Sequence, residues 1–131
     1  MISIKQSVLD QIVSHAKHDL SNEACGYLAG NDGVITHGYQ LTNIDHSPEH
    51  FSVDPAEQFQ TVRDARSKGL QIMANYHSHP ETPARPSVED ILLAYDPEIS
   101  YLIISLANNQ VDVKSFNIKD SIVEKEEIII I

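Results

Sequence analysis

Two histidines and an aspartate have the types and spacing of a metal-binding set. His77 and His79 are separated by one residue, and Asp90 follows after ten more. In an extended strand, residues i and i+2 point to the same face with Cα atoms about 6.6 Å apart, so both imidazoles can reach one ion. A carboxylate adds a third, charged ligand and leaves a fourth position for water. We therefore interpret these three residues as the donor set of a catalytic zinc site, since structural zinc sites close all four positions.

The segment between the second histidine and Asp90 is stiffened by Pro80, Pro83 and Pro86, because each proline fixes a backbone angle. A second interpretation of Asp90 stays open. Ser87-Val88-Glu89-Asp90 matches a helix start in which Ser87 is the N-cap and Asp90 lies in the first turn. The two interpretations are compatible, because one helix N-terminus can carry both a cap and a metal ligand.

A hydrolytic metal also needs a base that takes a proton from water and passes it to the leaving amine. The chain has 19 acidic residues. Glu23 is a candidate because it precedes the apolar stretch 24–28, where it would be partly removed from water. Spacing alone favours the other interpretation of Glu23, a water-exposed carboxylate in the loop between a helix and a strand.

The remaining chemically capable residues receive structural interpretations. Cys25 is expected to be a buried packing residue, since no cation or histidine is predicted beside it. Asn43, Asp45 and Ser47 could line a substrate cleft, although nothing in the sequence requires it. The five other histidines are interpreted as surface or hydrogen-bonded side chains: His15, His18, His37, His46 and His50.

Hydrophobic periodicity predicts the elements that must position these residues. Helices are expected at about 6–20, at 55–68 with Asp54 as cap and Gly69 as stop, and in a short stretch that begins at Ser87. Strands are expected at 2–4, 25–29, 34–41, 71–79, 101–107, 110–117 and 122–130, the last at a sheet edge. Helices interspersed with antiparallel hairpins indicate an α/β or α+β sheet domain.

Composition narrows the function classes. The 131 residues are most simply one domain, 1–131. The formal charge of −10, with only 9 Lys and Arg, argues against nucleic-acid binding, which needs clustered cations. No apolar run approaches the 18 or so residues of a membrane span. The single cysteine excludes an intrachain disulfide, and also a zinc nucleoside deaminase, which needs a P-C-x-x-C pair. A cytoplasmic protein is expected.

Three segments together resemble a known family: N-E-A-C-G-Y-L at 22–28, H-S-H-P at 77–80 and P-S-V-E-D at 86–90. A glutamate, a long gap, H-x-H, ten residues and an aspartate preceded by a serine form the pattern of the JAMM (MPN-plus) metalloproteases. The chain is most similar to their small stand-alone prokaryotic members, and the resemblance covers essentially its whole length. It implies a mixed, largely antiparallel curved sheet flanked by helices, of the MPN/JAMM type, which is cytidine-deaminase-like.

The resemblance also implies roles for these residues. His77, His79 and Asp90 would bind zinc, Glu23 would act as general base and then acid, and Ser87 would hydrogen-bond the tetrahedral oxyanion or the attacking water. An oxyanion donor of that kind is worth about 10²–10³ in rate. Zinc suits the imidazole and carboxylate ligands, which would also accept iron or manganese.

Family members cleave peptide or isopeptide bonds after the C-terminal glycines of ubiquitin-like proteins, and small prokaryotic members act on sulfur carriers of ubiquitin-like fold. The expected partner is therefore such a carrier, whose diglycine tail could add to a sheet edge. The motif does not distinguish a cysteine adduct from a lysine isopeptide, and the sequence gives no oligomeric state. Two alternatives remain: a non-catalytic scaffold of the same fold, and a metal-dependent amidase that acts on a small molecule.

Overall fold

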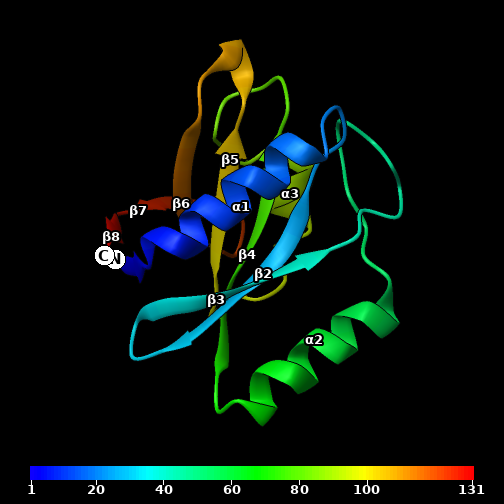
Figure 1. The fold of residues 1–131 in the computed structure, drawn as a ribbon. Coiled ribbons are helices and arrows are strands. Elements are labelled where there is room, and N and C mark those ends of the chain that lie inside the picture. Colours follow the sequence, from blue (N-terminus) through cyan, green and yellow to red (C-terminus); the bar gives the residue numbers. More distant parts are fainter.

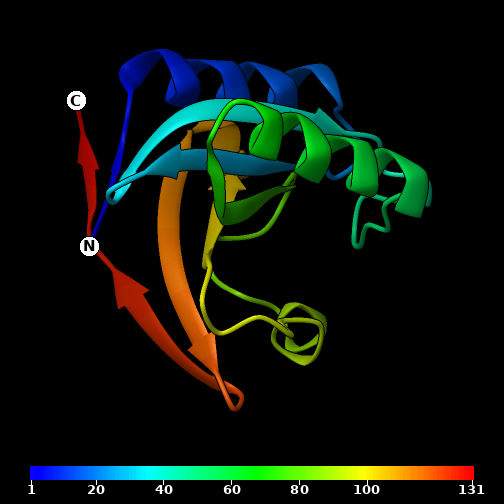
Figure 2. The same cartoon turned by 90° about the horizontal axis from the view of Figure 1, so that it is seen from below.

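The computed structural model describes residues 1–131, and one eight-stranded sheet organises them (Figure 1). Four of the seven strand pairs are antiparallel and three are parallel (β1 with β3, β1 with β8, and β4 with β5). The sheet is strongly curved (Figure 2). This is the mixed α+β architecture that the sequence predicts. In the order β7-β6-β5-β4-β2-β3-β1-β8, the strands are Ile122–Glu126, Asp112–Lys119, Ser100–Ser105, Gln71–His79, Cys25–Asn31, Val34–Leu41, Ile2–Ile4 and Ile128–Ile130.

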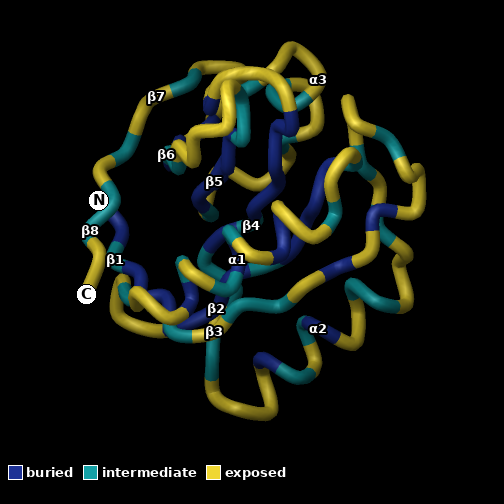
Figure 3. Tube along the Cα trace, turned by 45° about the horizontal axis from the view of Figure 1, so that its top comes forward, coloured by how far each residue is buried: buried dark blue, intermediate teal, exposed yellow.

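Helices α1 (Gln6–His18) and α3 (Val88–Leu92) lie on opposite sides of the sheet, and α2 (Pro55–Ser67) packs near β3 and β4 (Figures 1 and 2). A larger apolar core lies between α1 and the sheet, and its fully buried residues include Ile12, Leu28 and Leu102. A smaller core on the opposite face includes Ile103 and Phe116. The central strands are consequently the most buried part of the chain (Figure 3).

Local interactions define both ends of α2 and the end of α1. The Asp54 carboxylate accepts a hydrogen bond from the Ala56 N–H at 2.9 Å, and Gly69 adopts a φ of 71° beyond the last turn, so both predicted signals are confirmed. Helix α1 ends at His18, two residues before the predicted end. Leu20 is exposed, and the Asn22 N–H bonds to the Asp19 carbonyl in a turn, so no burial supports a further helical turn.

Strands 2–4, 34–41 and 71–79 form as predicted, and the strand expected at 25–29 continues to Asn31. The strands expected at 101–107 and 110–117 lie at Ser100–Ser105 and Asp112–Lys119 instead. The cause of the shift is a one-turn helix, Ala107–Asn109, in which Asn108 and Asn109 take left-handed backbone angles. Asparagine tolerates that conformation well. Residues 106–111 connect the two strands, which is longer than a two-residue hairpin.

The single strand predicted at 122–130 is wrong, because it is two strands with different partners. β7 pairs with β6, whereas β8 pairs with β1 at the other end of the strand order. The change occurs at Glu126, whose carboxylate accepts hydrogen bonds from the Ser100 and Ser115 hydroxyls at 2.6 and 2.7 Å. The Met1 ammonium lies 3.3 Å from the same carboxylate. β8 is an edge strand as expected, and the sheet is nearly closed.

None of the three helices is long and apolar enough to cross a membrane.

Candidate metal centre

Both histidines lie at the carboxyl end of β4, in the middle of the sheet. His77 pairs with Cys25 of β2 on one side and with Ile103 of β5 on the other, and His79 pairs with Ser105. Alternation along the strand places the two imidazoles on the face that carries the smaller core. His77 and His79 are 4% and 5% exposed. The two imidazoles therefore project from the buried centre of the sheet.

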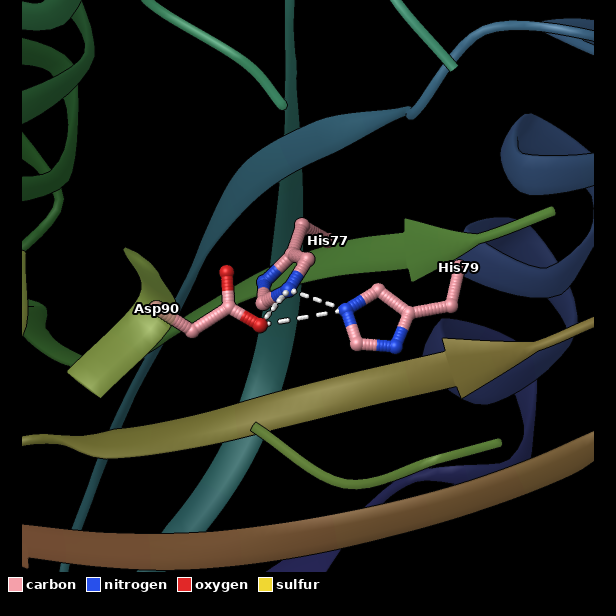
Figure 4. A group of neighbouring side chains, drawn as sticks. All are labelled: His77, His79 and Asp90. Atoms are coloured by element: carbon pink, nitrogen blue, oxygen red, sulfur yellow. Dashed lines mark hydrogen bonds and ion pairs between the residues drawn. The ribbon is translucent and has the colours of Figure 1, made fainter. Parts of the chain in front are cut away.

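The side chains of His77, His79 and Asp90 converge on one point (Figure 4). The Nε2 atoms of the two histidines are 3.1 Å apart, and each lies 3.1 Å from Oδ2 of Asp90. These three contacts cannot all be hydrogen bonds. If both histidines donate Nε2–H to the carboxylate, the contact between them joins two donors. The arrangement of the three atoms is therefore better suited to surrounding a cation than to pairing with one another.

The tautomer of His79 supports that conclusion. Its Nδ1 lies 2.9 Å from the carbonyl oxygen of Pro83, which can only accept, so Nδ1 carries a proton. If the ring is neutral, Nε2 then presents a lone pair to the Asp90 oxygen, so the contact is favourable only when the ring is protonated or a cation lies between the two atoms. A second partner of this kind commonly fixes the ring of a metal-binding histidine.

The pKa shifts of Asp90 and His79 also indicate that the site favours a positive charge. Burial raises the pKa of Asp90, but hydrogen bonds from His77 and His79 outweigh it, and the net pKa lies well below its usual range. Burial lowers the pKa of His79, but its bonds to Asp90 and to the Pro83 carbonyl outweigh that effect and raise the net value. The carboxylate therefore stays ionised, and the site favours a positive charge.

Zinc fits this donor set. Ligands held about 2.0–2.1 Å from a tetrahedral zinc ion are separated by about 3.3 Å, close to the contacts found here. All three ligand atoms lie within 4.8 Å of one another. Two histidines and a carboxylate leave one tetrahedral position free.

Asp90 is both a helix cap and a member of the cluster. Its Oδ2 accepts a hydrogen bond from the Ser87 N–H at 2.9 Å, and the Ser87 hydroxyl accepts one from the Asp90 N–H at 3.1 Å. The two interpretations of the sequence are thus compatible, as expected. Because α3 buries no residue of its own, this reciprocal cap and the contacts to His77 and His79 are the main restraints on its start.

Glu23 lies beside His79. It stands two residues before Cys25, which pairs with His77, so continuing the register places it opposite His79. It is only 3% exposed, and its Oε1 is buried without a hydrogen-bond partner. Burial, together with the negative charges of Asp90 and Glu89, raises the pKa of Glu23 to about 8. The interpretation of Glu23 as an exposed loop carboxylate is therefore wrong.

A pocket opens beside the cluster, between the segment that carries Phe51 and the start of α3. The Phe51 ring lies 5.0 Å from the His77 ring, centre to centre. A neighbouring hollow shares Asn75, Leu93 and Tyr101 with this pocket and continues along α2. The pocket is lined by His50, Phe51, Asn75, His77, Pro86, Glu89, Asp90, Leu93, Tyr101, Ile103 and Ile118.

His15 and Cys25 are not part of the cluster, although Cys25 pairs with His77 across β2 and β4. His15 is buried, and its Nδ1 lies 2.6 Å from the Tyr76 hydroxyl, so it is a hydrogen-bonded core histidine. Cys25 is buried as predicted, and burial with the nearby Glu57 and Asp19 charges raises the pKa of its thiol to about 12, which makes it a poor nucleophile.

Three residues support the site through contacts that the sequence did not predict. Ser78 is fully buried and joins β4 to the residue after Glu23 through two hydrogen bonds. Pro83 orients His79, and Phe51 covers His77. A serine between two site histidines was a usable signal, because a polar residue on the opposite face of a buried strand needs a partner. The contacts of Pro83 and Phe51 arise from loop folding and leave no local pattern.

Residues 5–119 match the family model described as prokaryotic homologs of the JAB domain. The chain belongs to this family. The Prok-JAB match confirms the JAMM resemblance inferred from the motifs. Among curated proteins, the chain is 30% identical to the CysO-cysteine peptidase of Mycobacterium tuberculosis, over 98% of this chain and 90% of that one. It is 32% identical to the desampylase of Haloferax volcanii, over 79% and 80% of the two chains.

Among solved structures, the Prok-JAB chain resembles a protein from Desulfitobacterium hafniense determined in solution. The two share 48% identity with a TM-score of 0.91, over 100% of this chain and 93% of that one.

Proposed function

We propose that this Prok-JAB chain is a zinc metallopeptidase that hydrolyses the bond after the C-terminal Gly-Gly of a ubiquitin-like or sulfur-carrier protein. The observation that carries the proposal is the meeting of two Nε2 atoms and one carboxylate oxygen at mutual distances of 3.1 Å. Such a set attracts a cation and leaves a coordination position free. Related chains named as a peptidase and a desampylase support hydrolysis of carrier conjugates.

A bound zinc ion would polarise the scissile carbonyl and lower the pKa of water at the free position. Glu23 would take the proton from that water and deliver it to the leaving amine. A base of this kind works best when its pKa is near the working pH, and the raised pKa of Glu23 meets that condition before the metal binds. The positive charge of the metal would then lower it.

Ser87 would donate its hydroxyl hydrogen to the oxyanion of the tetrahedral intermediate. Its Oγ already accepts from the Asp90 N–H, which holds the oxygen in place and leaves its hydrogen free to donate. The cap of α3 would therefore fix both Ser87 and the ligand Asp90.

The pocket beside His77 would receive the substrate tail. Its apolar walls include Phe51 and Tyr101, and the hollow along α2 extends it in one direction. A Gly-Gly tail is thin enough for such a groove because it has no side chains. A lysine isopeptide and a C-terminal cysteine adduct both present the same diglycine acyl group, so either could be the leaving side.

Metal analysis combined with turnover tests the proposal. Purified protein should contain close to one zinc per chain, and His77→Ala, His79→Ala and Asp90→Ala should each lose it. Glu23→Gln should keep the zinc but lose cleavage of a conjugate in which Gly-Gly is joined to cysteine or to a lysine side chain.

Unchanged zinc in the three ligand variants would overturn the site, and full activity in Glu23→Gln would overturn the assigned base. A protein that binds no zinc when metal is supplied would instead favour the scaffold alternative. Cleavage of small amides without cleavage of carrier conjugates would favour the amidase.

A further inference from the structure

Asn43 is almost completely buried although it lies in a loop, just after β3. It is 5% exposed. Its side-chain nitrogen donates to the carbonyls of Glu23 at 3.0 Å and His50 at 3.1 Å, with a longer contact of 3.4 Å to that of Ser47. Its side-chain oxygen accepts from the N–H groups of Asp45 and Ser52 at 3.1 and 3.3 Å. One side chain thus organises residues 43–52, which we call the Asn43 loop.

The Asn43 loop touches the metal centre at two places. Both backbone groups of Glu23 bond to it, because the Glu23 N–H donates to the Ser47 carbonyl at 2.8 Å and the Glu23 carbonyl accepts from Asn43. On the other side of the cluster, Phe51 of the same loop covers the His77 ring. A single hydrogen-bonded unit therefore frames the site from two directions.

The Glu23 carboxylate has few contacts of its own that could fix its position. Its Oε1 is buried without a partner, so no hydrogen bond to that oxygen helps to fix where the carboxylate points. The position of the carboxylate then depends on packing and on its backbone, which the Asn43 loop holds at both the N–H and the carbonyl.

We propose that Asn43 is a positioning residue, which sets the place of the Glu23 carboxylate and of the Phe51 ring relative to the two histidines. This inference rests on the proposed hydrolysis, in which Glu23 is the base. Asparagine suits the task because its amide both donates and accepts. Aspartate would keep the acceptor but lose both donated bonds to the Glu23 and His50 carbonyls, and it would add a charge near Glu23.

The test compares Asn43→Ala and Asn43→Asp with Asn31→Ala. Asn31 is a matched control, because its side chain donates to the Gly69 carbonyl at 2.9 Å at an exposed position outside the Asn43 loop. The probe is a synthetic peptide that ends in Gly-Gly, joined to the side-chain amine of a fluorescent lysine peptide. Both Asn43 variants should lose about 10- to 100-fold in kcat, the scale expected for a misplaced catalytic group. KM should change much less, with zinc content kept, and Asn31→Ala should match the wild type.

A second readout does not need turnover. Hydrogen exchange at the Glu23 N–H should speed up in both Asn43 variants while exchange in β4 stays slow, and the His77 ring protons should lose their shift from the Phe51 ring. An unchanged kcat, or unchanged exchange and ring shifts, would overturn the role of Asn43. Zinc loss or uniformly faster exchange would show a general structural role instead. A wild type that cleaves neither this peptide nor a carrier-protein conjugate would refute the proposed hydrolysis, while the exchange data would still test the positioning role of Asn43.

Discussion

The Ser78 hydroxyl accepts a hydrogen bond from the backbone N–H of Ala24 at 2.7 Å. The Ser78 N–H returns a bond to the Ala24 carbonyl at 3.0 Å. Both residues are fully buried. The pair extends the contact between β2 and β4 beyond the last paired residues, and it holds Glu23 beside His79. Ser78 therefore contributes to the geometry of the site from the opposite face of the sheet.

Replacing Ser78 with alanine should lower both stability and turnover. The Ala24 N–H would lose a buried partner, which costs about 1–3 kcal/mol in free energy of unfolding, and Glu23 would be less firmly held. Denaturant unfolding and kcat measure the two effects. Ser67→Ala is the control, because its exposed hydroxyl bonds to the Asp64 carbonyl on α2. Equal stability of the two variants would contradict this role.

Zinc should order the start of α3, because Asp90 is at once its cap and a proposed zinc ligand. On adding zinc at about 100 times its dissociation constant, the protein should gain about 2.7 kcal/mol. The Ile91 and Leu93 N–H groups, which bond within α3, should exchange more slowly.

Two variants distinguish the capping role of Asp90 from its proposed zinc-binding role. Asp90→Ala should lose both the zinc effect and the metal-free order of α3, while Asp90→Asn should keep the cap and bind zinc poorly. Amides of α2 serve as the internal control. Equal protection of α3 with and without zinc in the wild type would refute the coupling.

The metal-free protein should lose stability as pH rises from about 4.5 to about 8. The pKa of Glu23 is raised from its ordinary 4.5 to about 8 in the folded chain, so folding favours its protonated form. That contribution is complete below about pH 4.5 and is lost progressively as pH rises to about 8.

Glu23→Gln removes the titrating group, so it should flatten the pH dependence and make the metal-free protein more stable than wild type at pH 8. Urea unfolding in the presence of a chelator measures this. Parallel curves for the two proteins between pH 5 and 8 would contradict the raised pKa.

Glu126 should matter for stability and not for metal binding. Burial raises its pKa, but hydrogen bonds from Ser100 and Ser115 outweigh it and lower the net value. Its stabilisation is therefore present above its ordinary pKa and is lost as pH falls. Glu126→Ala should cost about 1–3 kcal/mol near neutral pH and keep full zinc content. The exposed Glu124→Ala is the matched control, and equal unfolding midpoints for both would refute the role.

The sequence predicts the clustering of His77, His79 and Asp90 because the signals for it are local. The i, i+2 spacing of His77 and His79 and the helix-start pattern at Ser87 each depend on a few neighbouring residues, and both form as expected. The burial of Glu23 was not predictable in this way. It depends on Ser78, which lies 55 positions away along the chain, and on a loop whose folding is set by Asn43.

The difference between local signals and long-range contacts also explains why the single strand predicted at 122–130 was wrong. The alternation from residue 122 to 130 is a valid strand pattern, but the change of partner at Glu126 depends on Ser100, Ser115 and Met1. Periodicity reports which residues favour extended backbone. It does not report which strand will lie beside them.

Oδ2 of Asp90 both accepts the Ser87 N–H at the start of α3 and faces the two histidines. This combination affects how such a protein can evolve. Aspartate and asparagine codons differ by one nucleotide, and an asparagine at this position could still accept from the Ser87 N–H and begin α3. A single mutation could thus abolish the chemistry and leave the surface and the fold intact. In a gene duplicate, that change would cost little stability. A descendant that keeps only the proposed binding of a carrier tail could then arise without passing through an unfolded intermediate.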